Sequence, residues 1–356
     1  MAGVLQKAKT EKKVLLIFVF LLFTSASRAQ IFPDPESSNN PNHAMDRYHE
    51  ELRFNEPMMY LAFPVISPLV KRTVPLRDGE GRDGYWVEGQ FAHRFVAYQG
   101  KYYSYPLFQR LRLTFDVSIL SRLTRDDSNP LLPSSNKFGF GLDFLLSSLK
   151  KLNEQRGGLV WTTLQLHHHS NGQADSFFLD TPVKRNNYKS GDFSANYWRA
   201  YLNISSNSAN TNLIIGGIGY QSQIDFKGPL GSNNELKNYY GDDRWLFHLH
   251  WIKKPTIETV HTVNRGITNG DTVKRDVRRQ FSIRTELEYI TGDLSLFPEE
   301  NKYRLGWHNY LTYMPSVTNE IGFMLHTYMG RDYLNIRFDD IVFIGEAGLF
   351  FKFNSK

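Results

Sequence analysis

A run of three histidines followed by serine, asparagine and glycine, HHHSNG at 167–172, is the stretch with the clearest capacity for chemistry. An imidazole can activate a serine hydroxyl by taking its proton, and a third group can hold the imidazole in place. The same histidines could instead bind a metal ion, or they could be interfacial residues beside a turn. These interpretations differ in the direction of each side chain, so they depend on the element that carries the run.

Residues 157–170 show the period-two alternation of a β-strand. One face carries Val160, Thr162, Leu164, Leu166, His168 and Ser170, and the other carries Trp161, Thr163, Gln165, His167, His169 and Asn171. His168 and Ser170 therefore continue the apolar face, where a polar pair costs free energy because lipid-facing polar groups lack partners. Such a pair is a candidate for function. Side chains at i and i+2 stand about 6.5–7 Å apart on one face, so His168 can accept the hydroxyl proton of Ser170.

A candidate for the orienting group lies on the next predicted strand, near 195–206. Asn196 shares the mostly apolar parity of Trp198, Ala200, Leu202 and Ile204. Two adjacent antiparallel strands would thus bring Ser170, His168 and Asn196 to one surface, as a nucleophile, a base and a group that fixes the ring. The metal interpretation would use His167 and His169, which share the opposite face, but the sequence identifies no further ligand for them.

The rest of the chain predicts an all-β protein. Alternation recurs in RLRLTFDVSIL at 110–120, and the chain ends in an alternating aromatic strand, IVFIGEAGLFFKF. The predicted strands run to about ten to fourteen residues, which is longer than is usual in soluble sheets. Aromatic residues make up 14% of the chain and gather near strand ends, as interfacial girdles require. We therefore predict a transmembrane antiparallel β-barrel rather than a soluble sandwich.

About twelve strands are predicted, near 58–66, 86–98, 108–122, 138–149, 157–170, 195–206, 211–224, 243–254, 276–291, 303–314, 319–331 and 341–353. An even number returns both termini to the periplasm, with short turns inside and longer loops outside. Residues 255–275 fit this scheme badly, because they form a long connection where a short turn is expected. Either the flanking strands extend into a protruding hairpin, or the strand count is off there.

The beginning of the chain predicts export. Residues 1–29 carry basic residues before an unbroken apolar run at 14–23, with small residues at 27 and 29, which is typical of a signal peptide cut before Gln30. A membrane anchor is the alternative, but ten apolar residues are too few to cross about 30 Å of hydrocarbon. Residues 30–57 are predicted to be an N-terminal periplasmic or surface-lying segment, and 58–356 the outer-membrane barrel.

Composition excludes several classes of protein. The net charge is +6, and residues 1–29 account for +4 of it, which leaves +2 for the remainder. That charge is too small to indicate a nucleic-acid partner. The absence of cysteine means that an exported chain has no disulfide framework, so packing and strand pairing must stabilise it.

The segment HHSNGQAD at 168–175 resembles the HxSNGxxD signature of the outer-membrane phospholipases A. Asn196, with Leu202 six residues on, looks like that family's strand with the catalytic asparagine, and GRDYLNIRF at 330–338 is similar to the segment before its last strand. The resemblance extends loosely from about 86 to 353. Two departures stand out: 24 residues, 172–195, separate the signature from Asn196, and Gln173 stands where the family commonly has arginine.

The resemblance implies a twelve-strand barrel that acts as a serine hydrolase of A1 or A2 type on phospholipids of the outer membrane. Ser170 would be the nucleophile, His168 the base and Asn196 the orienting residue. It further implies a Ca²⁺ cofactor, held partly by backbone carbonyls such as those of Gln173 and Asn129, and a homodimer as a possible active form.

The alternative is a non-catalytic outer-membrane barrel, either porin-like or structural. A porin-like barrel requires an open lumen. The predicted lumen face carries both signs of charge and looks self-paired, with Arg110, Arg112, Asp116, Arg284, Glu286 and Glu288.

Overall fold

The fold was analysed in a computed structural model, which describes residues 48, 51–52, 58–65, 69–71, 84–100, 106–125, 131–150, 157–179, 185–188, 190–208, 212–226, 230–233, 236, 239–263, 272–295, 302–315 and 321–352. The predicted signal peptide lies outside these residues, and so does the segment 30–57 apart from Tyr48, Glu51 and Leu52. Both assignments therefore stay predictions. Among the described residues, no helix is both long and apolar enough to span a membrane.

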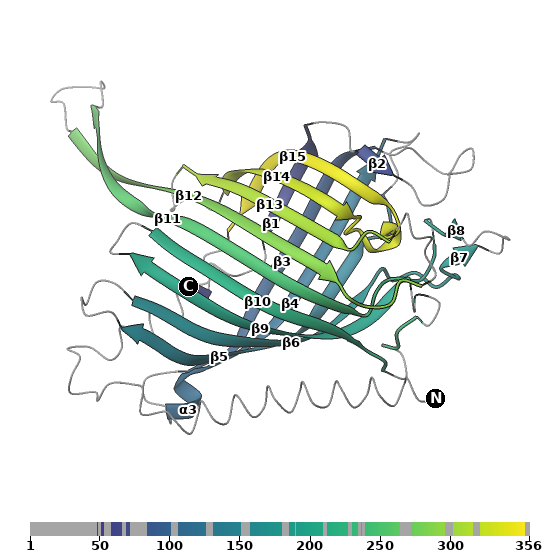
Figure 1. Cartoon of the computed structure of the whole chain (residues 1–356). Helices are drawn as coiled ribbons and strands as arrows, with labels where there is room; N and C mark the ends of the chain where they lie inside the picture. The colour runs from purple at the N-terminus through teal and green to yellow at the C-terminus, as the bar shows by residue number, and fades with distance from the viewer. Residues whose placement is uncertain are drawn as a thin grey trace.

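Twelve antiparallel strands form a closed barrel, as the alternation predicts (Figure 1). They are β1 (Met59–Pro64), β3 (Tyr85–Gln99), β4 (Leu111–Thr124), β5 (Ser135–Lys150), β6 (Gly157–Ser170), β9 (Ser194–Ser208), β10 (Asn212–Ile224), β11 (Asp243–Val263), β12 (Thr272–Ile290), β13 (Leu305–Met314), β14 (Ile321–Arg331) and β15 (Ile341–Phe351). The first strand closes the barrel by pairing with the last, from Met59↔Phe351 to Pro64↔Glu346. The predicted bounds of β6 agree with the observed ones.

Three short strands and one short helix lie between the barrel strands. The strand β2 (Leu69–Lys71) pairs with β15 beyond the end of β1. The strands β7 (Phe178–Leu179) and β8 (Arg185–Asn186) form a small ladder in the loop between β6 and β9. The helix α3 (Pro106–Gln109) precedes β4.

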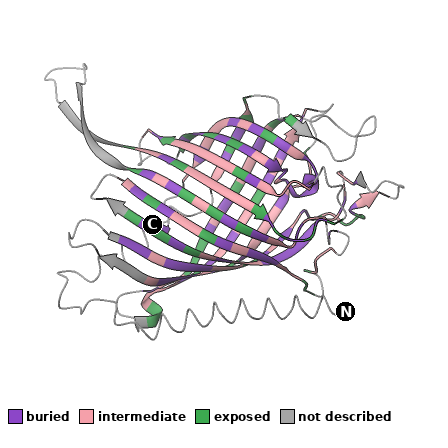
Figure 2. Cartoon of the chain, in the orientation of Figure 1, coloured by how far each residue is buried: buried purple, intermediate pink, exposed green. Residues whose placement is uncertain are grey.

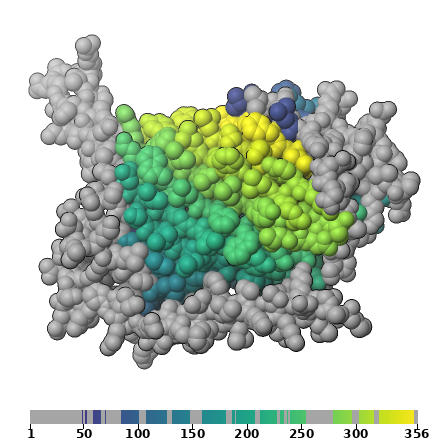
Figure 3. All heavy atoms as spheres, in the orientation of Figure 1, coloured from purple at the N-terminus to yellow at the C-terminus, as the bar shows by residue number. Residues whose placement is uncertain are grey.

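Side chains alternate between the two faces of the barrel wall, which Figure 2 shows as alternating colours along the strands. In β14, every second residue from Gly322 to Tyr328 is buried, and those between are mostly exposed. Large apolar side chains are exposed on the outer face, including Phe91, Phe95, Leu113, Phe140, Leu166, Leu202, Ile204, Ile218, Leu249, Ile283, Phe323 and Leu325. Figure 3 shows part of this wall as a continuous surface. An apolar exterior of this kind suits contact with lipid.

The long connection at 255–275 is explained by a hairpin. Pairing of β11 with β12 shifts between Lys253 and Thr256 and then continues to Val263↔Thr272. The two strands thus extend past the barrel rim as a protrusion, visible at the upper left of Figure 1. The hairpin alternative was correct, and the strand count needs no change.

Ion pairs line the lumen, as the mixed charges of its face predict. Arg94 binds Asp116 with Nε 2.7 Å from Oδ1, and Arg244 binds Glu288 with Nη1 2.6 Å from Oε1. Arg284 Nε lies 2.5 Å from Glu286 Oε1. These paired charges line a lumen cavity of about 350 Å³.

Residues from outside the strands enter both ends of the barrel. We call the end where β6 finishes at Ser170 the outer end. At the opposite end, the ring of Tyr48 packs edge-on against Trp161 at 6.3 Å, and Leu52 joins the same buried apolar cluster. The cluster also contains Leu145, Leu159, Leu213, Ile215 and Ile252. Tyr48 and Leu52 therefore pack into the apolar cluster at this end of the lumen.

At the outer end, the loop 332–340 folds over the lumen. It contains the 3-10 helix η5 (Asn335–Arg337), and its Leu334, Ile336 and Phe338 are buried. The Phe338 ring stacks on Phe177 at 5.6 Å. Arg122 anchors the loop, because its Nη1 lies 2.7 Å from Asp332 Oδ2 while its Nε lies 2.6 Å from Glu88 Oε2.

We predict that Arg122→Met destabilises the barrel by roughly 3–5 kcal/mol, since it leaves two buried carboxylates without their shared counter-charge. The measurement is equilibrium unfolding in urea of the protein refolded into lipid. Arg279→Met, at an exposed position of β12, is the control and should change stability little. A loss at Arg122 no larger than that of the control would contradict the anchoring role.

The same loop predicts a pH dependence. Burial, reinforced by the carboxylate of Asp340, raises the pKa of Asp339 from its usual value near 3.8 to about 7. The folded state therefore holds this proton more tightly than the unfolded chain, so the contribution to stability is complete below about pH 4 and is lost as pH rises through about 7. Hydrogen exchange of 332–340 should show stronger protection at pH 5 than at pH 8. Asp339→Asn should flatten this difference, and an unchanged pH dependence in the variant would assign it to another group.

Candidate active site

The outer ends of β5, β6 and β9 form a grid of six residues around the HHHSNG segment. His168 is paired with Phe138 on β5 and with Asn196 on β9. One step further out, Ser170 is paired with Asn136 and Ser194. The ladder thus brings the three residues predicted to form a triad to neighbouring positions on the barrel wall.

The three histidines point as the alternation predicts. His168 and Ser170 are half-buried, whereas His167 and His169 are buried and line the lumen cavity. His167 Nε2 lies 3.4 Å from Asp116 Oδ2, and His169 Nε2 lies 2.7 Å from Ser135 Oγ. Each of the two inward histidines therefore uses its Nε2 on a side chain of β4 or β5.

His168 is held by Asn196 through a hydrogen bond of 2.8 Å between Nδ1 and Oδ1. The Asn196 amide nitrogen donates to the carbonyl oxygen of Leu230 at 2.6 Å, and Ser232 Oγ lies 3.4 Å from it. A carbonyl oxygen can only accept a hydrogen bond, so the NH₂ group of Asn196 must point toward Leu230. The amide oxygen of Asn196 must then face the imidazole of His168. Nδ1 then carries the ring proton, and Nε2 is left with a lone pair that can accept one.

Asn196 differs from its sequence prediction in one respect. We expected it to stand on the open lipid face, yet it is 2% exposed. The segment 230–233 covers it and also contacts the next row of the grid, where Ser194 Oγ donates to the Gly231 carbonyl at 2.7 Å. Strand alternation gives the face of a residue but cannot show that a loop packs over it.

Ser170 completes the grid without a direct bond to the base. Among the described residues, no hydrogen bond joins Ser170 Oγ to the His168 ring. The two side chains share a face at i and i+2, so rotation of the serine side chain would bring its hydroxyl toward Nε2. Catalytic hydrogen bonds in substrate-free enzymes are often long and shorten only in the complex.

Asn171 and Gly172 fix the chain just beyond the serine, a role that the sequence interpretation did not assign. Asn171 is buried, and its Oδ1 accepts from the backbone N–H of Gln173 at 3.2 Å and of Phe193 at 3.0 Å. Its Nδ2 donates to the Gly191 carbonyl at 2.7 Å. Gly172 has a φ of 68°, which favours glycine, so both residues of the motif are needed to turn the chain back toward β9.

Oxygen donors suited to calcium lie next to this turn. Gln173 is half-buried, and Asp175 exposes its carboxylate two residues later. Calcium prefers carboxylate and carbonyl oxygens, so these residue types fit such an ion. Asn129, the other predicted carbonyl donor, lies outside the described residues.

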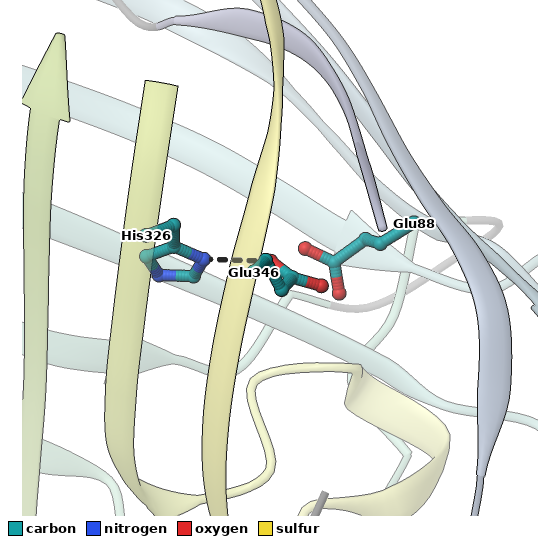
Figure 4. A group of neighbouring side chains, drawn as sticks. All are labelled: Glu88, His326 and Glu346. Atoms are coloured by element: carbon teal, nitrogen blue, oxygen red, sulfur yellow. Dashed lines mark hydrogen bonds and ion pairs between the residues drawn. The ribbon is translucent and has the colours of Figure 1, made fainter. Parts of the chain in front are cut away.

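A second group that could hold a metal ion lies in the lumen: Glu88, His326 and Glu346, whose ligand atoms lie within 4.8 Å of one another (Figure 4). All three are buried. His326 Nδ1 lies 2.8 Å from Glu346 Oε2, while Tyr85 donates to the other oxygen of Glu346.

The carboxylate of Glu88 in that group also accepts hydrogen bonds from other side chains of the protein. Its oxygens accept from Tyr60 at 2.5 Å, from Tyr333 at 2.8 Å and from Arg122 at 2.6 Å. The imidazole of His326 also contacts His308, with 3.1 Å between Nε2 and Nδ1. The ligand atoms are thus used in a hydrogen-bonded network across the lumen, and we assign the group to the structure of the barrel.

An aromatic row marks the level of the candidate site on the outer wall. Trp198, two residues from Asn196 on the same face of β9, contacts Tyr220 with 5.8 Å between ring centroids. Tyr220 in turn contacts Trp245 of β11 at 5.2 Å. Tryptophan and tyrosine gather where a bilayer meets water, so a row of this kind suits a membrane interface.

Comparison with known proteins supports the fold. No protein-family model and no curated protein sequence matches the chain. Among solved structures, outer-membrane phospholipase A from Escherichia coli is similar with a TM-score of 0.50 and 14% identity, over 88% of this chain and 94% of that one. The Salmonella typhi outer-membrane phospholipase, a dimer with bound calcium, gives a TM-score of 0.49 at 14% identity, over 83% of this chain and 90% of that one. A porin of Rhodopseudomonas blastica gives a TM-score of only 0.25 at 8% identity, over 83% of this chain and 99% of that one. The chain therefore has the barrel fold of outer-membrane phospholipase A.

Proposed function

We propose that this protein is an outer-membrane phospholipase that hydrolyses acyl ester bonds of phospholipids, as a hydrolase of A1 or A2 type. The observation that carries the proposal is the hydrogen bond from His168 Nδ1 to Asn196 Oδ1, with Ser170 beside the histidine on the same face. An imidazole with a fixed tautomer next to a serine is the arrangement that activates a hydroxyl. The barrel fold agrees with this function.

In the proposed reaction, Ser170 Oγ attacks the ester carbonyl while His168 Nε2 takes the hydroxyl proton. His168 then gives this proton to the leaving alcohol, and a water molecule hydrolyses the acyl-serine with the same base. Asn196 holds the ring through both steps. An amide cannot neutralise the imidazolium as a carboxylate would, so its contribution is orientation and choice of tautomer.

The position of the grid suits a lipid substrate. A phospholipid in the outer leaflet could approach the wall laterally, with its ester groups near the aromatic row and its acyl chains along the apolar exterior. No passage through the barrel is required. A porin-like function has less support, because ion pairs and the loop 332–340 occupy the described lumen.

We also propose that Ca²⁺ assists the reaction and that two copies of the chain associate in the active form. The Gln173 carbonyl and the Asp175 carboxylate would contribute to the ion site, with Asn129 as a further candidate. When bound, the ion would polarise water near the carbonyl oxygen that becomes negative.

The function is tested by five single substitutions. Ser170→Ala should abolish hydrolysis of a phospholipid in mixed micelles, and labelling of the serine by a fluorophosphonate should disappear with it. His168→Ala should lower the rate by about 10²–10⁴-fold, because the serine loses its base. Asn196→Ala should lower it less, since the base stays present but is free to rotate. His167→Ala and His169→Ala are the matched controls, and their inward side chains should matter far less for the rate.

The refolded variants must first migrate as folded barrels in an unheated gel. If His167 or His169 proves indispensable while His168 is dispensable, the proposed hydrolase is wrong. In that case the metal interpretation of the histidines has to be taken up.

The calcium proposal is tested by chelation. Activity should fall when a chelator removes divalent ions and should return with Ca²⁺ but not with Mg²⁺, which demands a smaller octahedral site. Asp175→Asn should raise the calcium concentration needed for half-maximal activity. Chemical crosslinking should detect the dimer under the conditions that restore activity. Full activity of a monomer in chelator would exclude both proposals while leaving the triad intact.

A further inference from the structure

We propose that Asn136 is a further catalytic residue, whose side-chain amide N–H stabilises the oxyanion that forms when Ser170 attacks the ester. This inference rests on the proposed hydrolase function and adds a residue to it. Asn136 lies on β5 in the row of the grid that contains Ser170, and the reaction proposed above gives it no role.

Asn136 stands directly beside the nucleophile. The β5–β6 ladder pairs Asn136 with Ser170, and the next pair on the same face is Phe138 with His168, whose rings lie 4.9 Å apart. That ring contact shows that Phe138 and His168 lie on the same face, which Asn136 and Ser170 share two residues further along each strand. Directly opposed residues in an antiparallel pair have Cβ atoms about 4.5–5.5 Å apart, so the Asn136 amide reaches the space next to Ser170 Oγ.

The Asn136 amide turns its oxygen toward Ser134 in the structure. Ser134 Oγ donates to Asn136 Oδ1 at 2.9 Å, which occupies the carbonyl side of the amide. Among the described residues, Asn136 Nδ2 makes no hydrogen bond, and the side chain is half-exposed. The amide therefore offers its two N–H groups and not its oxygen to a molecule at the serine.

The two asparagines that flank β6 are thus turned in opposite senses. Asn196 uses its N–H groups on Leu230 and offers its oxygen to the base, whereas Asn136 uses its oxygen on Ser134 and keeps its N–H groups. The base needs an acceptor for its Nδ1–H, and an oxyanion needs donors. Each amide is oriented for the charge that develops beside it.

A side-chain donor would add to the few backbone donors near the serine. The N–H of the residue after a nucleophile often serves an oxyanion hole, but that of Asn171 donates to the Phe193 carbonyl at 3.1 Å. β6 is also paired on both sides as far as Ser170. The flat wall of a barrel therefore has few free backbone N–H groups to offer.

Ser170 Oγ forms a bond to the carbonyl carbon, the π electrons of the carbonyl move onto its oxygen, and the hydroxyl proton moves to His168. Asn136 Nδ2–H donates to the resulting oxyanion. The electron pair then re-forms the carbonyl, the bond to the alcohol oxygen breaks, and that oxygen takes the proton from His168.

The test compares Asn136→Leu with Asn309→Leu in the full chain. Asn309 is a matched control, because it also lies on the outer face of the wall, on β13, remote from the triad along the sheet. Removal of one oxyanion donor typically lowers kcat by about 10²–10³-fold, so we expect that loss for Asn136→Leu with KM changed by less than about threefold. The control should keep the parent rate.

A second measurement separates an oxyanion donor from a residue that only shapes the wall. An alkyl boronic acid forms a tetrahedral adduct with an active serine, so its inhibition constant should rise in Asn136→Leu by about the same factor as kcat falls. Binding of a non-reactive alkyl amphiphile should not change. Loss of kcat without loss of boronate affinity would overturn the proposal in favour of a structural role.

Asn136→Asp distinguishes donation from metal binding. A carboxylate keeps the shape but removes both donors and adds negative charge, so we expect a loss at least as large as that of Asn136→Leu. Preserved activity with tighter calcium binding would instead make Asn136 Oδ1 an ion ligand and would exclude the oxyanion role. An inactive parent protein would overturn the hydrolase function itself. An active parent with an equally active Asn136→Leu would overturn only this inference.

Discussion

The closed ladder of backbone hydrogen bonds constrains every other feature of this protein. A strand that faces hydrocarbon must pair all its backbone polar groups with neighbouring strands, and only a closed sheet satisfies this at both edges. The pairing imposes a strict period of two, so adjacent residues belong to opposite environments. His167, His168 and His169 are chemically identical, yet the middle one faces outward and its neighbours meet Asp116 and Ser135 in the lumen.

Position alone does not make these residues a candidate triad, because a polar group on the outer wall also needs partners. The loop segment 230–233 supplies them for Asn196 by accepting from its amide and covering it. The amide is thereby fixed before any substrate arrives, and it fixes His168 in turn. A rigid wall and one covering loop together create a small polar area beside an apolar surface.

Much of the fold follows from local pattern. The alternation predicts the strands and the inward or outward direction of the site residues, because both depend only on a period of two along one segment. The resemblance of HHSNGQAD to the phospholipase signature directs attention to Ser170, and alternation then pairs it with His168. The hairpin of β11 and β12 could be stated only as one of two alternatives, since its pairing continues beyond a bulge that the sequence does not reveal.

Contacts between distant segments could not be predicted in this way. Leu230 bonds to Asn196 from 34 positions away, and Arg122 joins Asp332 from 210 positions away. The sequence alone does not single out Asn136, because its place beside Ser170 depends on the register of β5 against β6. A shift of one residue would turn it into the lumen. Register and loop packing are properties of the assembled barrel, and no single segment encodes them.

Closure of the barrel by the first and last strands also has a consequence for the order of folding. The pairs from Met59↔Phe351 to Pro64↔Glu346 join positions almost three hundred residues apart. Loop-closure entropy must be overcome before such a contact stabilises anything, which makes barrel formation slow compared with hairpin formation. Until β15 is available, β1 and the growing edge of the sheet expose unpaired backbone groups that can pair with other chains. The chain is therefore most exposed to aggregation in the time between its synthesis and the closure of the barrel. That time lasts until the final strand, β15, pairs with β1.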